Sequence, residues 1–138
     1  MAKNLEAAFS INAQVTQAEL TAAVTDSSSA AGATLLYTVP TDDAKVYVIR
    51  FINSQVTQAA SSATLAKVWI TDNTGVTLYL YEEGLMAATT RSATVRGATV
   101  DILIDRVLQA GCKIYCAISV RAGVQDNVAV TLLAAKYT

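Results

Sequence analysis

The stretch Lys45–Asn53, KVYVIRFIN, decides the fold class because six of its nine residues are apolar and all six are β-branched or aromatic. Such residues favour extended strands, where side chains alternate between two faces. A strand whose two faces are both apolar is typical of a central strand that is covered on each side. The faces predicted by strict alternation carry Val46, Val48 and Ile52 on one side, and Tyr47, Ile49 and Phe51 on the other.

Outward from this stretch, the same period of two recurs in short runs that are separated by turn-forming residues. Besides 45–53, the predicted strands are 34–39, 65–71, 76–82, 98–104, 113–120 and 127–135. No long helical period is visible. Seven or eight short strands predict an all-β fold, which we expect to be a jelly-roll-like antiparallel β-sandwich of about 8 strands over residues 33–138.

The first 32 residues form a different kind of segment. Phe9, Ile11 and Val15 alternate with polar residues, residues 16–23 fit either a helix or an extended segment, and a small, polar stretch follows at 25–32. We therefore expect residues 1–32 to be an extended N-terminal arm and linker whose strand adds to the edge of a sheet. Phe9, Ile11 and Val15 are predicted interface residues, and the sequence leaves open whether the arm packs on its own domain or on a neighbour.

The composition favours partner proteins over other partners. Of the 138 residues, 53% are hydrophobic and 15% are charged, against a norm of about 25% charged. A small domain this poor in charge either exposes a neutral surface or buries it against neighbours, and we expect the second. The net charge of −1 gives no reason to expect nucleic acid or an anionic membrane as a partner.

Residue types that carry catalysis are scarce. The chain has no histidine, which excludes Ser-His and Cys-His arrangements. The carboxylate pairs Asp42/Asp43 and Glu82/Glu83 are predicted to be solvated turn charges, because neighbours on a strand point to opposite faces. The segment 72–75 lacks the ligand spacing of a calcium loop and is predicted to be a hairpin turn. We expect no enzyme activity, no cofactor and no metal site.

The two cysteines, Cys112 and Cys116, are predicted to lie on one strand. Four residues of strand separate them by about 13 Å, which is too far for a disulfide. We expect both to be small buried residues, with Cys116 on a core face that it shares with Ile114, Ile118 and Val120.

Tyr79 and Tyr81 share one face of their predicted strand, and they are the best candidates for an exposed aromatic patch. Aromatic side chains on strands favour a half-buried face or a protein interface. A carbohydrate-binding platform is the alternative, and it requires Trp69, Tyr79 and Tyr81 to be exposed together.

Two segments, Leu36–Pro40 (LYTVP) followed by Lys45–Asn53, and Val107–Gly111 (VLQAG), carry a resemblance. Over roughly residues 33–120 the chain resembles the small β-sandwich virion proteins of tailed bacteriophages, which include capsid decoration (cement) proteins and some neck and tail components. The resemblance implies a virion structural protein, often a homotrimer at capsid three-fold positions.

We therefore expect a capsid decoration protein that binds the major capsid protein shell and stabilises the head. The alternatives are a neck or tail component and, third, a carbohydrate-binding module. No signal peptide or long apolar run is visible in the sequence, so we expect synthesis in the host cytoplasm and a final location on the virion.

Overall fold

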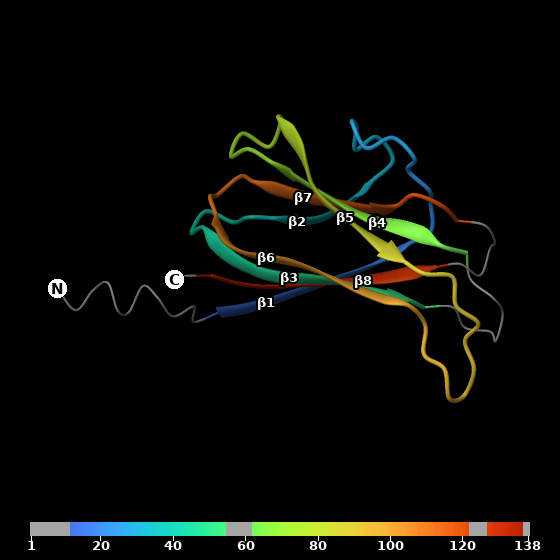
Figure 1. The fold of residues 1–138 in the computed structure, drawn as a ribbon. Helices are drawn as coiled ribbons and strands as arrows, with labels where there is room; N and C mark the ends of the chain where they lie inside the picture. The colour runs from blue at the N-terminus through green and yellow to red at the C-terminus, as the bar shows by residue number, and fades with distance from the viewer. Residues whose placement is uncertain (1–11, 55–61, 122–126, 137–138) are drawn as a thin grey trace.

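The computed structural model describes residues 12–54, 62–121 and 127–136, and over these ranges the protein is built from strands without helices. Eight strands form two four-stranded sheets that face each other, as Figure 1 shows. All strand pairs within the sheets are antiparallel. The prediction of an all-β, antiparallel β-sandwich with about 8 strands is confirmed.

Each sheet combines strands from distant parts of the chain. Sheet A contains, in spatial order, β1 (Asn12–Leu20), β8 (Val128–Lys136), β3 (Ala44–Asn53) and β6 (Thr99–Leu108). Sheet B contains β2 (Thr34–Thr38), β7 (Lys113–Ile118), β4 (Thr64–Thr71) and β5 (Leu78–Met86). The first strand thus pairs with the eighth, the second with the seventh, the third with the sixth and the fourth with the fifth.

The core lies between the sheets and is formed by alternate residues of the inner faces. Phe51, Ile49 and Leu132 from sheet A are fully buried there, as are Val68 and Ile114 from sheet B. Each such side chain contributes about 1.5–3 kcal/mol relative to an exposed one. The buried set also includes Cys116 and Ile118, in agreement with the predicted core face of β7, but the prediction is wrong for Val120, because β7 ends at Ile118 and Val120 is 44% exposed.

The predicted faces of β3 are wrong because the strand contains a bulge at Tyr47. The extra residue shifts the alternation, so Val46 and then Ile49 and Phe51 point inward. Ile52 lies on the outer face and is 39% exposed. The strand is central within sheet A, yet among the described residues only its inner face is covered by another sheet.

The described part of the expected N-terminal arm belongs to the sandwich. β1 pairs with β8 from Asn12 to Leu20, and Leu20 is buried in the core. Residues 12–20 of the expected arm are thus part of sheet A. Residues 1–11, with Phe9 and Ile11, lie outside the described part of the chain. Continuous pairing with β8 satisfies the backbone of residues that are too polar to form a core of their own.

Residues 21–33, which we call the strap, cross the outer face of sheet B. Val24 donates a backbone hydrogen bond to Ile118, and its buried side chain packs with Trp69 and Ala117. In Figure 1 this blue segment lies above β7 and β4, on the side away from sheet A. The expected linker is therefore a cover for one sheet.

The two segments that carry the sequence resemblance lie against each other. Val39 donates to the carbonyl of Cys112 at 2.9 Å, and Gly111 donates to the carbonyl of Val39 at 3.0 Å. Gly111 has φ of +92°, and a Cβ there would lie 2.2 Å from the carbonyl oxygen of Asn73. Only glycine fits this turn, which joins three connections at one end of the sandwich.

β5 runs from sheet B toward the edge of sheet A and closes one side of the sandwich. At Gly84 a Cβ would lie 2.5 Å from Cγ1 of Val100 on β6. The Tyr81 hydroxyl donates a hydrogen bond to the carbonyl of Leu103, also on β6. β5 is longer than the sequence predicted, because it continues to Met86.

Candidate functional site

The structure places the described interface candidates on two separate surfaces. Val15 lies on β1, at one edge of sheet A, and is 61% exposed. Tyr79 and Tyr81 lie on β5, next to the opposite edge of sheet A. Tyr79 is 60% exposed, whereas Tyr81 is half-buried. The described candidates therefore lie at two separate sites, one on the outer face of sheet A and one beside its β6 edge.

The first surface is the outer face of sheet A. Val15 pairs with Leu133, Leu133 with Val48, and Val48 with Leu103. These four residues, which we call the aliphatic row, cross the whole sheet at one level. Leu103 is 66% exposed and Leu133 is 41% exposed. Val48 between them is half-buried, so the row presents aliphatic side chains across all four strands, and such a feature marks an interaction surface.

Polar residues border the aliphatic row on one side. The adjacent level holds Gln17, Thr131, Arg50 and Asp101, in that order across the sheet. Arg50 donates two hydrogen bonds to Asp101, at 2.7 and 2.9 Å. This interaction lowers the pKa of Asp101 and raises that of Arg50. Three residues of the row (Val15, Val48 and Leu133) and two of the polar level (Arg50 and Thr131) line an open depression of about 450 Å³.

The second surface is a recess of about 240 Å³ between the ends of β4, β5 and β6. Tyr79, Leu80 and Tyr81 line it together with Arg106, whose guanidinium lies 5.7 Å from the centre of the Tyr81 ring. Leu80 is 42% exposed. Tyrosine and arginine side chains around an apolar depression are typical of the residues that dominate protein interfaces.

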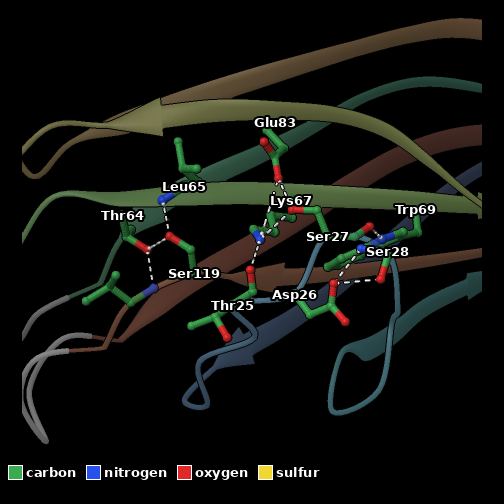
Figure 2. Close-up of polar contacts among 11 residues, drawn as sticks. Thr25, Asp26, Ser27, Ser28, Thr64, Leu65, Lys67, Trp69, Glu83 and Ser119 are labelled. Atoms are coloured by element: carbon green, nitrogen blue, oxygen red, sulfur yellow. Dashed lines mark hydrogen bonds and ion pairs between the residues drawn. The ribbon is translucent and has the colours of Figure 1, made fainter.

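A third cluster, which the sequence did not indicate, lies under the strap. Lys67 points outward from β4 yet is only 2% exposed, because the strap covers it. Its Nζ donates to the Thr25 carbonyl at 2.9 Å and to Ser27 Oγ at 2.8 Å, and lies 3.5 Å from Oε1 of Glu83. Figure 2 shows these groups converging on the lysine. The buried ammonium thus has an acceptor for each of its three N–H donors.

Trp69 fixes the same segment two residues further along β4. Its ring is fully buried, and Nε1 donates to the Ser27 carbonyl at 3.0 Å. Asp26 stabilises the local turn by accepting hydrogen bonds from the amide and hydroxyl of Ser28, which lower its pKa (Figure 2). The strap is thus held by a lysine, an indole and a short turn.

The pairing of Ser27 with Lys67 invites comparison with a serine–lysine catalytic dyad. In a dyad the amine accepts the hydroxyl proton. Here Lys67 donates to Ser27, and the Ser27 hydroxyl donates to the Glu83 carboxylate. Lys67, Ser27 and Glu83 thus form an ion pair bridged by a hydroxyl group, and this network anchors the strap.

Two of the predicted solvated carboxylates have protein partners. Asp43 accepts a hydrogen bond from the amide of Ala110 at 2.7 Å and so joins two turns. Glu83 belongs to the Lys67 cluster. At the turn after β4, hydrogen bonds from Thr74 and Thr77 lower the pKa of Asp72 to about 2, in keeping with the predicted hairpin turn.

Neither cysteine has the environment of a reactive thiol. Both are buried and free, as predicted. Burial raises the pKa of the Cys116 thiol to about 12, and that of Cys112 is also raised by burial. A raised pKa keeps the thiol protonated, and the thiolate is the nucleophilic form. These side chains contribute to packing.

Over the described ranges, no group of three potential metal-ligating side chains gathers at one place. The same residues include no helix long and apolar enough to cross a membrane. No family model, curated protein or solved structure matches the chain. The surfaces described above are therefore the basis for assigning a function.

Proposed function

We propose that the protein is a non-enzymatic virion structural protein, and specifically a capsid decoration (cement) protein that binds the shell of major capsid protein and stabilises the head. The resemblance of residues 36–53 and 107–111 to phage β-sandwich virion proteins supports this assignment. We further assign the jelly-roll topology. It is supported by the pairing of first with eighth, second with seventh, third with sixth and fourth with fifth strand, which is the order of two interlocked Greek keys.

The observation that carries the proposal is the recess around Tyr79. Tyr79, Leu80 and Arg106 are exposed there and Tyr81 is half-buried, at a closed edge of the sandwich where a loop of another protein can insert. Such residues bind by exclusion of water and by hydrogen bonds at the tyrosine hydroxyl and the guanidinium. On a shell, many copies of one contact act together, so a modest contact suffices to bridge capsid subunits.

The test uses shells assembled from the major capsid protein of the phage that carries this chain. We expect the purified full chain to sediment with these shells, and Tyr79→Ala with Arg106→Ser to raise the dissociation constant by at least about tenfold. Leu85→Ser is the matched control, because Leu85 is 66% exposed on the same strand but outside the recess. Absence of the wild-type chain from the pelleted shells would refute the proposal.

A reconstruction of the virion distinguishes the alternatives by position. Density on the capsid surface supports decoration, whereas density confined to the neck or tail supports the second assignment. The homotrimer implied by the resemblance is tested by the native mass of the chain.

The carbohydrate-binding alternative loses one of its required rings. It needs Trp69, Tyr79 and Tyr81 exposed on one platform, and Trp69 is fully buried under the strap. The remaining tyrosines lie in the recess, beside Arg106 and Leu80, and they serve the contact proposed above.

A further inference from the structure

We propose that the outer face of sheet A is a self-association surface, on which a second copy of this chain packs face to face about a two-fold axis parallel to the strands. The inference goes beyond the proposed binding to a capsid, and it replaces the trimer that the resemblance implies. It stands on the register of four strands and on the arrangement of charges across them.

The outer face of sheet A is large enough for a specific interface. Four strands at a spacing of about 4.8 Å, each about seven residues long at about 3.4 Å per residue, give about 450 Å² of projected face. Protruding side chains have an accessible area larger than this projection. Two such faces therefore reach the roughly 1,000 Å² that a specific interface needs.

The outer face of sheet A is complementary to a second copy of itself. An axis running between β8 and β3 places β8 of one copy over β3 of the other, and β1 over β6. Because residues of the aliphatic row share one level, the row then covers itself: Leu133 lies over the partner copy's Val48, and Val15 over its Leu103. Packed sheets cross at about 30° and lie about 10 Å apart, which keeps these pairs within contact range.

The charged side chains on this face favour one direction of the two-fold axis. With the axis parallel to the strands, Arg50 faces the partner copy's Thr131, and Asp101 faces its Gln17, so no like charges meet. With a two-fold axis along the aliphatic row, the residues on one side of the row would instead lie over the partner copy's residues on the other side of the row. It would place Lys45 over the partner copy's Arg50, which is unfavourable. The two-fold axis parallel to the strands is thus the arrangement that joins the apolar row without opposing charges.

Access to this face also differs from that to sheet B. The strap already covers the outer face of sheet B, whereas no described segment covers the aliphatic row. The recess around Tyr79 lies beside the β6 edge of sheet A, and none of the residues that line it belongs to the aliphatic row, so a pair formed through the row leaves it for the shell. Self-association and shell binding are therefore separable by mutation.

The test measures native mass with two complementary variants of the full chain. We expect Val15→Glu alone to raise the dissociation constant of the pair by more than about thirtyfold, because two carboxylates then face apolar Leu103 side chains. Leu103→Lys alone is expected to weaken the pair in the same way. Leu85→Glu is the matched control, since Leu85 and Leu103 are both 66% exposed and only Leu103 lies in the row.

Mixing the two variants tests the axis itself. A chain with Val15→Glu and a chain with Leu103→Lys are expected to form a mixed pair, in which glutamate faces lysine at one end and the wild-type contact remains at the other. Circular dichroism and thermal unfolding confirm that each variant is folded. A wild-type chain that is monomeric at about 100 μM, a trimer unaffected by Leu103→Lys, or failure of the mixture to pair would overturn the inference. Loss of shell binding with the pair retained would count against the proposed function alone.

Discussion

The outer faces of the two sheets differ in how they are covered. On sheet B, the strap buries Trp69 completely and leaves Lys67 2% exposed. On sheet A, Val15 and Leu103 at the two ends of the aliphatic row remain 61% and 66% exposed. Within the described residues, the chain covers one apolar face with its own strap and leaves the aliphatic row of the other exposed, which offers a surface to another protein.

The comparison also shows that side-chain type alone does not decide exposure. Lys67 is charged and buried, because the strap supplies acceptors for its ammonium group. Leu103 is apolar and exposed, because no described segment reaches it. Position relative to the strap determines which of the two faces contributes to stability and which is available for contact.

The largest expected difference in the free energy of unfolding is between truncation of a large residue on the covered face of sheet B and one on the exposed face of sheet A. Trp69→Ala removes the centre of the strap contact and is expected to lower the free energy of unfolding by about 3–5 kcal/mol. Leu103→Ala, measured at a concentration where the chain is monomeric, is expected to change it by less than about 0.5 kcal/mol. Urea unfolding of both variants checks this. Similar effects at the two positions would show that the faces are equally covered in solution.

A smaller difference in the free energy of unfolding is expected between loss of the buried Lys67–Glu83 pair and loss of the exposed Arg50–Asp101 pair. Lys67→Met leaves the Thr25 carbonyl without its donor and the Glu83 carboxylate without its counter-ion, and it is expected to cost about 1–3 kcal/mol. Arg50→Met breaks an exposed pair on sheet A and is expected to cost at most about 1 kcal/mol. Equal costs in urea unfolding would contradict the burial of Lys67 by the strap.

The smallest expected effect is a pH response on sheet A. Hydrogen bonds from Arg50 lower the pKa of Asp101 in the folded protein. A carboxyl group with a lowered pKa stabilises the fold above its ordinary value near 3.9, and this contribution is lost as pH falls through the lowered pKa. In a carboxyl NMR titration, Arg50→Gln is expected to raise the pKa of Asp101 toward the ordinary value. An unchanged pKa would show that the pair does not form.

Much of the sheet structure could be predicted from alternation, because period two follows from strand geometry. The segments 34–39, 65–71 and 113–120 appear as strands close to their predicted bounds. The faces of β3 could not be predicted, since one inserted residue at Tyr47 exchanges inward and outward positions without any change in composition. A bulge depends on the neighbouring strands, and their register is absent from a single sequence.

The strap and its buried lysine were also beyond prediction. Residues 25–32 are small and polar, which is typical of a linker, and their role appears only when they meet Lys67 and Trp69 about 40 positions later. Of the predicted interface residues, Tyr79 and Tyr81 do lie in one recess, and Val15 is exposed at the other side of the molecule. Pairing across the sheet is what joins Val15 to Leu103, and no local pattern shows it.

The native mass of the wild-type chain tests most directly whether the open face of sheet A is an interface between copies. At about 100 μM the account predicts a particle of twice the 14.5 kDa chain mass, which dissociates when Val15→Glu is introduced. A particle of one or three chains that does not respond to Val15→Glu would contradict it.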